Sequence, residues 1–354
     1  MSSSTSAPTS TPSAAPALTR IGYIGLGSMG IPIARNLIKY ISANKLEPLT
    51  VWNRSKVKYQ TLNSSPSSEN TEASFHAAED LGEVVDRCDV VLTSLINDQA
   101  AQEVYGELFK AASQKAQGQE TGGKRERGVI FVDQSSLKAV TSGQLAEQAK
   151  AAGATYIASP VFGRPPAAEA AKLLIVLSGD QATKDLVKPL LVPALGDRLV
   201  DIGEDVRKAS ALKSMGNMLL LGFIELLGEA YAIGDSVDID PAVFNNFITQ
   251  FLPAPPLLAY SNNISKGLFP SGGGFSIDGG MKDARNMLSL GSDLGHPCSL
   301  PTVELALKNM ERAKEIGGPS QDWSALSIVL REQAGLEPFR EGTNNGQGQG
   351  SGQK

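Results

Sequence analysis

Two polar side chains one helical turn apart are the clearest candidates for chemistry in this sequence. Lys213 and Asn217 stand in the run Lys213-Ser214-Met215-Gly216-Asn217, within a long segment that is mostly apolar. Residues four apart share one helix face, so both side chains point the same way. Burial of an ammonium group lowers its pKa and suits it to proton transfer, and a neighbouring amide can hold a substrate oxygen. The alternative is a lysine that extends to the surface near the helix start.

A glycine-rich turn between two apolar runs marks a second candidate site. The pattern Gly25-x-Gly27-x-x-Gly30 follows a strand-like run, 21–24, and leads into helical apolar spacing at 31–38; a second strand-like run covers 49–52. In this βαβ context the glycines permit a tight turn, close approach of a pyrophosphate and close packing of the helix, whose N-terminal N–H groups bind phosphate. A plain glycine-rich turn is the alternative. The predicted cofactor-binding loop consists of Gly25, Leu26, Gly27, Ser28, Met29 and Gly30.

The end of the second strand bears on the choice of cofactor. Enzymes that use NAD usually carry an acidic residue there, which binds the ribose 2′-OH. This chain has Asn53-Arg54-Ser55 and no carboxylate. A guanidinium and a hydroxyl suit the 2′-phosphate of NADP, which a carboxylate would repel. The pattern therefore favours NADP over NAD, and the alternative is that Arg54 is an ordinary solvated arginine.

Composition argues against several other kinds of site. Hydrophobic residues make up 41% of the 354 residues and the net charge is −5, so no broad positive field for nucleic acid is expected. The two cysteines, Cys88 and Cys298, and the two histidines, His76 and His296, are far apart and predict neither a metal site nor a histidine-based triad. Few cysteines fit a reducing compartment, so we expect a cytoplasmic protein, with the mitochondrion as the alternative. No uninterrupted apolar run is long enough to predict a membrane span.

The order of predicted elements indicates two domains. Strand-like and helical segments alternate up to about residue 203, which predicts a mostly parallel, doubly wound α/β sheet. Beyond it we expect only helices, the first a long and deeply buried one at about 205–237. The predicted strands are 89–95, 128–133, 155–158, 173–177 and 199–202, and the further helices 99–112, 139–152, 241–251, 278–292, 301–316 and 323–332. The predicted divisions are a disordered leader at 1–19, an NAD(P)-binding domain at 20–203, an all-helical substrate and dimerisation domain at 204–336, and a disordered tail at 337–354.

Five motifs spread along the chain share the order of one family. They are the segment 25–37, Asp133-Gln134-Ser135-Ser136, Lys213-x-x-x-Asn217 with Glu229, Lys282-Asp283, and Asp322-x-Ser324-Ala325. Together they resemble the β-hydroxyacid dehydrogenases, which include 3-hydroxyisobutyrate and 6-phosphogluconate dehydrogenases and tartronate semialdehyde reductases. The resemblance covers nearly all of 20–335. It implies a Rossmann domain, an all-α domain joined to it by the long helix, a site between the two domains, and a homodimer.

The resemblance also implies roles at the reacting centre. Lys213 would be the general acid/base that takes the hydroxyl proton while hydride leaves the adjacent carbon for the nicotinamide. Asn217 would hold the substrate, and Ser135 would bind the carboxylate or hydroxyl of the substrate. No metal is needed for these roles.

Four further residues are matched with cofactor-binding positions of the family. Ser136 stands where the family has a threonine beside the nicotinamide ribose, and Lys282 where it has a lysine that faces the cofactor. Leu95 and Ile96 match a Leu-Pro pair that lines the adenosine half, with isoleucine in place of proline.

One loop departs from the family. A substrate-binding stretch that reads Asp-Ala-Pro-Val-Ser-Gly-Gly in the family reads 158–164 as Ala-Ser-Pro-Val-Phe-Gly-Arg here. Phe162 replaces a small hydroxyl residue and Arg164 replaces a flexible glycine, so the carboxylate pocket around Phe162, Gly163 and Arg164 must be reshaped. Arg164 would supply a new anion clamp or point to solvent, and Phe162 would favour a more apolar substrate. These alternatives stay open on the sequence.

Three functions compete on these observations. The first is an NADP-dependent oxidoreductase that acts on a β-hydroxyacid or its semialdehyde, a small substrate with a carboxylate or related polar group. The second is a reductase of another C=O or C=N compound, as in imine reductases of this fold. The third is a catalytically idle dinucleotide-binding module. Retention of Lys213 favours the first, and Phe162 with Arg164 weighs mildly against it.

Overall fold

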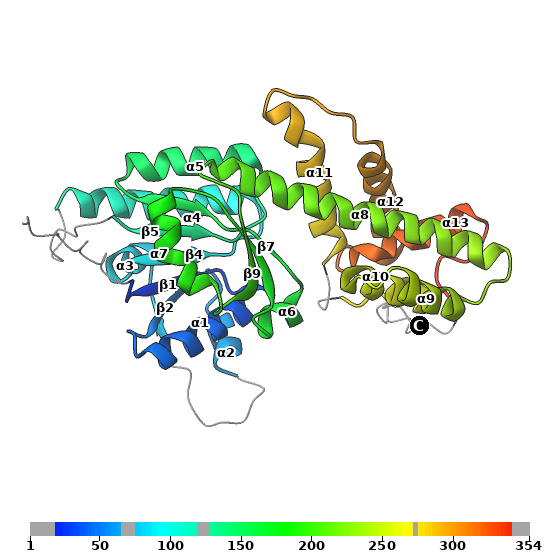
Figure 1. Ribbon diagram of the computed structural model, residues 1–354, viewed down its shortest axis with the longest axis horizontal. Helices are drawn as coiled ribbons and strands as arrows, with labels where there is room; N and C mark the ends of the chain where they lie inside the picture. The colour runs from blue at the N-terminus through cyan, green and yellow to red at the C-terminus, as the bar shows by residue number, and fades with distance from the viewer. Residues whose placement is uncertain (1–17, 65–74, 119–127, 272–274, 342–354) are drawn as a thin grey trace, which may run out of the picture.

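The computed structural model describes residues 18–64, 75–118, 128–271 and 275–341. The molecule has two parts, a mixed α/β domain and a helical domain, and one long helix runs through both (Figure 1). Most of the predicted leader and tail, 1–17 and 342–354, lies outside the described residues, so the prediction of disorder there stays a prediction. Residues 337–341 of the predicted tail are described, and Arg340 among them pairs with Asp235 of the long helix.

The first domain is built on a six-stranded parallel sheet. Its strand order is β3-β2-β1-β4-β5-β6, and the order reverses between β1 and β4, as in doubly wound sheets. The strands β1, β4 and β5 are buried along their whole length because helices cover both faces. The strands are β1 (Ile21–Ile24), β2 (Leu49–Trp52), β3 (Phe75–Ala77), β4 (Val90–Thr93), β5 (Ile130–Asp133) and β6 (Thr155–Ala158).

Helices pack on the two faces of this sheet and enclose separate apolar cores. One core joins α1 (Gly30–Asn44) and α7 (Gln181–Leu191) to the sheet; the other joins α3 (Leu81–Arg87), α4 (Asp98–Ala116) and α5 (Ala139–Ala151). Figure 1 shows α4 and α5 above the strands and α1 below them. The short helix α2 (Lys58–Asn63) follows β2. The predicted doubly wound α/β fold is confirmed, although β3, α3 and α7 were not predicted.

A second, three-stranded sheet follows β6. It contains β7 (Val161–Phe162), β8 (Leu173–Leu177) and β9 (Gly196–Asp201), with α6 (Pro165–Glu169) between the first two. The expectation that 173–177 and 199–202 continue the parallel sheet is wrong. Only Ser159 and Pro160 separate β6 from β7, whereas a parallel neighbour needs a crossover of about a dozen residues. The chain therefore turns back, and β7 pairs antiparallel with β8.

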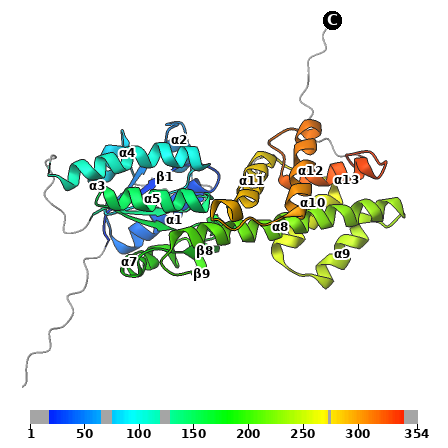
Figure 2. The same ribbon diagram turned by 90° about the horizontal axis from the view of Figure 1, so that it is seen from above.

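The described part of the second domain is largely helical, as predicted. The helix α8 (Val206–Ser236) contacts α5 and β6 near its start and α10, α11 and α13 further along (Figure 2). The unpredicted helix α10 begins at two prolines, which suit the first helical positions but resemble a break in sequence. The other elements are α9 (Pro241–Phe251), α10 (Pro255–Lys266), α11 (Ile277–Asp293), α12 (Pro301–Gly317), the 3₁₀ helix η1 (Trp323–Leu326) and α13 (Ser327–Gln333).

The long helix α8 is buried on one face only. Leu221, Ile224 and Tyr231 lie in the core of the helical domain, whereas Leu219 is 61% exposed and Ile233 67% exposed. The prediction of a deeply buried helix is therefore wrong for one copy of the chain. Among the described residues, α8 has the length and apolar composition of a membrane span, with 44% of that window buried. This is weak evidence for a membrane, because a helix that packs through two domains meets the same criteria.

Candidate active site

The loops after four parallel strands meet at one edge of the sheet. The glycine loop follows β1, Asn53-Arg54-Ser55 follows β2, Leu95 and Ile96 follow β4, and Ser135 with Ser136 follow β5. The carboxyl ends of strands in a doubly wound sheet, next to the reversal of strand order, are where such folds bind ligands. The fold thus brings together the residues predicted to bind the cofactor.

The geometry of the glycine loop fits a dinucleotide. Gly25 has a φ of 99°, and a Cβ there would overlap the carbonyl oxygen of Ser94; a Cβ at Gly30 would overlap the carbonyl oxygen of Gly25. Nothing lies within 4 Å of the Cβ position of Gly27, which leaves space for a phosphate to approach the backbone. In the described part of the chain, the N–H groups of Ser28 and Met29 donate no hydrogen bond, and the first turn of α1 carries no acidic residue.

Of the residues after β2, Asn53 has a structural role and Arg54 faces solvent. Asn53 Oδ1 accepts the N–H of Leu26 at 2.8 Å, so this side chain fixes the glycine loop. Its Nδ2 donates to the carbonyl oxygen of Ser55. Arg54 is exposed and has no ion pair among the described residues. Its guanidinium is therefore available to an anion beside the loop.

Ser135 is tied to the sheet rather than to the pocket. Its Oγ accepts the N–H of Leu95 at 2.8 Å, and its own N–H donates to Asp133 Oδ1 at 2.9 Å. Asp133 also accepts from Thr93 and Tyr156, and burial raises the pKa of this carboxyl above its usual range. This network joins the ends of β4, β5 and β6. The substrate-binding role predicted for Ser135 stays a prediction.

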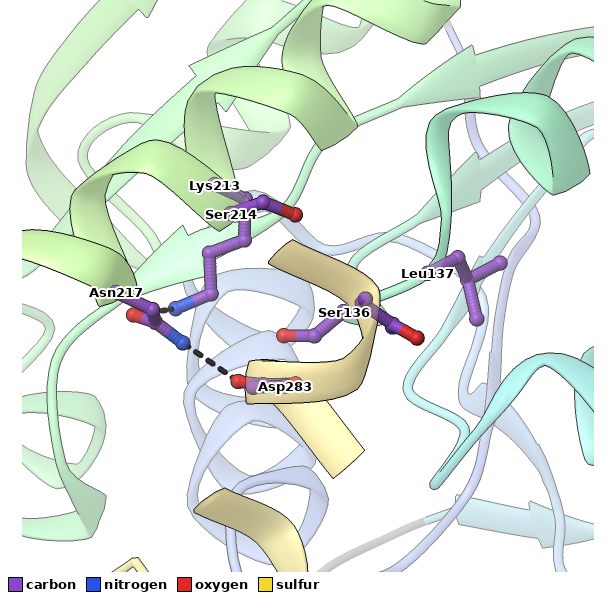
Figure 3. Close-up of a pocket in the computed structure, with 7 residues that line it drawn as sticks. Ser136, Leu137, Lys213, Ser214, Asn217 and Asp283 are labelled. Carbon is purple, nitrogen blue, oxygen red and sulfur yellow. Dashed lines mark hydrogen bonds between the residues drawn. The ribbon is translucent and has the colours of Figure 1, made fainter. Parts of the chain in front are cut away.

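Lys213 and Asn217 lie on α8 where the two domains meet. Lys213 Nζ donates to Asn217 Oδ1 at 3.1 Å, and Asn217 Nδ2 donates to Asp283 Oδ2 on α11 at 2.6 Å (Figure 3). A carboxylate only accepts hydrogen bonds, so it fixes the amide with its oxygen toward the ammonium. Sequence reasoning gave Asp283 no role, although the Lys282-Asp283 pair was one of the motifs that carried the family resemblance.

Burial decides the protonation behaviour of Lys213. Loss of hydration lowers the pKa of Lys213 to about 8, while Asp283 raises this pKa and Lys282 lowers it. A lysine with a pKa near neutrality can donate a proton as the ammonium and accept one as the neutral amine at physiological pH.

Lys282 connects the helical domain to the sheet edge. Its Nζ donates to the carbonyl oxygen of Ser136 at 2.8 Å and pairs with Asp283 Oδ1 at 2.8 Å. The pocket between the domains therefore lies directly beside the predicted nicotinamide-binding residue Ser136. The sequence also gave no role to three residues that line this pocket, Leu137, Ser214 and Asn286. The complete lining consists of Ser136, Leu137, Lys213, Ser214, Asn217, Asp283 and Asn286.

The substrate loop at 162–164 touches both domains. The Phe162 ring lies under Lys213 Nζ, 4.1 Å from Nζ to the ring centroid. Gly163 has a φ of 145°. Arg164 pairs with Asp322 at 3.1 Å and lies over the Tyr260 ring, so it does not simply point to solvent. The anion clamp predicted for it stays a prediction. Arg164 is half-buried and joins the loop to the helical domain.

No group of three or more His, Cys, Asp or Glu side chains with metal-binding geometry occurs within the described ranges.

Comparison with known proteins establishes the family. Residues 20–203 match the NAD binding domain of 6-phosphogluconate dehydrogenase, and the chain belongs to this family. The oxidoreductase YfjR of Bacillus subtilis is 30% identical over 88% of this chain and all of its own length. The NADH-dependent oxidoreductase ucdB of Aspergillus ustus is 26% identical over 88% of this chain and 98% of its own. Mouse mitochondrial 3-hydroxyisobutyrate dehydrogenase is 26% identical over 91% of this chain and 89% of its own.

Solved structures share the fold. A Mycobacterium tuberculosis 3-hydroxyisobutyrate dehydrogenase with L-serine superposes with a TM-score of 0.70 at 21% identity, covering 89% of this chain and 99% of the other. An imine reductase from Myxococcus stipitatus with NADP+ gives 0.55 at 19% identity, covering 88% and 99%. The protein is an NAD(P)-dependent oxidoreductase of the hydroxyacid dehydrogenase family. These relatives are oxidoreductases, which favours an enzyme over the catalytically idle dinucleotide-binding module considered from the sequence.

Two substitutions on α11 should move the pKa of Lys213 in opposite directions. Asp283→Asn removes the negative charge that favours the ammonium and should lower this pKa, whereas Lys282→Met removes a neighbouring positive charge and should raise it. The pH dependence of Lys213 labelling by an amine reagent, read by mass spectrometry, measures both shifts. Shifts in the same direction, or none, would contradict the arrangement of charges.

Proposed function

We propose that this protein interconverts an alcohol and a carbonyl compound, with NADP as the preferred cofactor and Lys213 as the general acid/base. The observation that carries the proposal is the position of Lys213: it lies in a pocket beside Ser136, its pKa is lowered to about 8, and an amide and a carboxylate orient it. From the family, the first substrate class is a β-hydroxyacid or its semialdehyde.

The residues of the chain supply binding, orientation and proton transfer. The bound nicotinamide supplies or accepts the hydride. The glycine loop, with its open space at Gly27 and unpaired N–H groups at Ser28 and Met29, fits the pyrophosphate. In the reductive direction Lys213 Nζ donates a proton to the carbonyl oxygen; in the oxidative direction it takes the hydroxyl proton. Asn217 keeps a second N–H on Nδ2 that can donate to the substrate oxygen.

A reductase of another C=O or C=N compound is the second candidate. The observation that favours it is the Phe162 ring against Lys213, where the family has a small hydroxyl residue. An apolar ring beside the acid/base supports a less polar substrate than a hydroxyacid.

A second copy of the chain is the partner that we propose. The exposed face of α8 carries Met215, Leu219, Phe223 and Leu226, which recur at intervals of three or four residues. Neighbouring α9 exposes further apolar side chains, among them Phe251 at 65%. Contiguous apolar surfaces of this kind mark protein interfaces, and a self-complementary face closes as a dimer.

The substitution Lys213→Met should remove the acid/base without removing cofactor binding. We expect kcat/KM to fall by about two to four orders of magnitude, with the NADPH affinity unchanged. In the wild type, reduction needs the protonated amine and should decline as pH rises through about 8, while oxidation needs the neutral amine and should increase over the same range. Lys208→Met, an exposed position on the same helix, is the control. Equal activity of the Lys213 and Lys208 variants would rule out the proposed role.

The substitution Arg54→Ala should weaken NADPH binding but not NADH binding. We expect the wild type to prefer NADPH and the variant to lose about tenfold or more in NADPH affinity, because a charge-assisted contact to the 2′-phosphate is gone. Calorimetry with both cofactors measures this, with Arg198→Ala, another exposed arginine, as the matched control. A wild type that binds both cofactors equally, or prefers NADH, would overturn the NADP assignment and leave the oxidoreductase in place.

Charges on the exposed face of α8 should dissociate the proposed dimer. The double substitution L219D/F223D places two carboxylates in the proposed apolar contact, and we expect light scattering to give a dimer for the wild type and a monomer for the variant. V57D alters an exposed apolar residue of the first domain and should remain dimeric. A monomeric wild type would contradict the proposal.

A further inference from the structure

The Phe162 ring occupies a notch that a glycine makes in α8. A Cβ at Gly216 would lie 2.5 Å from Phe162 Cε1 and closer still to Cζ, so any larger residue would displace the ring. Real Cβ atoms essentially never approach a carbon so closely. Phe162 and Gly216 are therefore a matched pair, one large and one small, on two elements that are far apart in sequence.

The ring covers one side of the Lys213 ammonium. Nζ lies 4.1 Å from the ring centroid, within the range of a cation–π interaction. An ammonium has three N–H donors. One is donated to Asn217 Oδ1, and the ring face covers another direction of approach. Substrate must therefore reach Lys213 from the side that Asn217 and the Phe162 ring leave open.

The other cations near the loop already have carboxylate partners. Arg164 pairs with Asp322, whose side chain is fully buried and also accepts the N–H of Phe275. Lys282 pairs with Asp283, a carboxylate that itself lines the pocket. Among the described residues, Lys213 is then the cation of the pocket that has no carboxylate in an ion pair with it. The proposed reaction uses the Lys213 ammonium as the proton donor, so this charge is not a permanent partner for a substrate carboxylate. A substrate carboxylate held here would be desolvated without a dedicated counter-charge.

We infer that Phe162, admitted by Gly216, is a specificity-determining residue that selects uncharged carbonyl substrates with an apolar substituent over substrates that carry a carboxylate. The inference rests on the proposed hydroxyl–carbonyl chemistry, and it favours the second candidate substrate class, a less polar carbonyl compound, over the β-hydroxyacids. The volume and the apolar surface of the ring exclude a substrate carboxylate from this position. The ring also contacts the Lys213 ammonium on a side that the small hydroxyl residue of the family would leave open.

Two aldehydes, one with a carboxylate and one with the corresponding neutral methyl ester, test this inference. Succinic semialdehyde and its methyl ester share the reacting group and the chain length, and NADPH oxidation reports both. We expect the wild type to favour the ester by about tenfold or more in kcat/KM, and F162S to reduce that ratio by about tenfold, mainly through a lower KM for the acid. A wild type that favours the acid, or a ratio unchanged in F162S, would overturn the inference.

A second pair of variants separates the shape of the ring from its charge interaction. F162L keeps an apolar side chain but removes the π face, so it should retain the preference for the ester while the pH midpoint of reduction moves down, because the ring favours the ammonium form. F162S should change both. If F162L lowers the ester-to-acid ratio of kcat/KM as much as F162S does, the volume of the side chain does not explain the selectivity, which contradicts the inference.

The matched pair can be tested through Gly216. G216A should lower kcat/KM for the ester in the wild-type background, because the new Cβ displaces the ring, and should be tolerated once F162S has emptied the notch. If the effects of G216A and F162S on the free energy of catalysis are additive in the double variant, direct packing of Phe162 on Gly216 is contradicted.

Binding separates a failure of the inference from a failure of the proposed function. If neither aldehyde is turned over, the proposed reaction fails for this class, and isobutyramide and isobutyrate, an isosteric unreactive pair, are titrated into the complex with NADP+. Tighter binding of the amide by the wild type, with gain of isobutyrate binding in F162S, supports the selection against carboxylates. Equal binding, tighter binding of isobutyrate, or binding of neither contradicts it.

Discussion

A half-buried lysine side chain that has lost much of its hydration is the constraint on which this site depends. Hydration of an ammonium is worth more than any one contact that replaces it, so Lys213 needs several compensating neighbours. Asn217 accepts one of its N–H groups, Asp283 lies behind that amide, and the face of Phe162 lies against the charge. These groups come from α8, α11 and β7, so the environment exists only when both domains are in place.

The contacts between the domains are consequently part of the site. Lys282 on α11 donates to the carbonyl oxygen of Ser136 at the end of β5, and Arg164 from the loop after β7 pairs with Asp322 in the helical domain. The helix α8 carries Lys213 across the boundary and packs on α5 before it enters the helical domain. A pocket built this way places the acid/base beside the sheet edge where the cofactor loops meet.

The sequence predicts the parts of this arrangement that depend on local pattern. The glycine loop, the end of β2 and the spacing of Lys213 and Asn217 are short-range features, and the structure has the strands and helices they require. Features that depend on distant partners were missed or wrong. The pairing of β7 with β8, the partner of Arg164 and the notch at Gly216 involve residues that are not neighbours in the chain. Apolar spacing also could not tell which face of α8 is covered within one copy and which is left exposed.

The structure of the complex with NADP+ tests the central claim most directly, because it locates the nicotinamide relative to Lys213. The account predicts the pyrophosphate at the glycine loop, the ring beside Ser136, and its reacting carbon facing the pocket that Lys213 and Asn217 line. A nicotinamide bound away from this pocket, or domains that separate so that Lys213 is hydrated, would contradict the account.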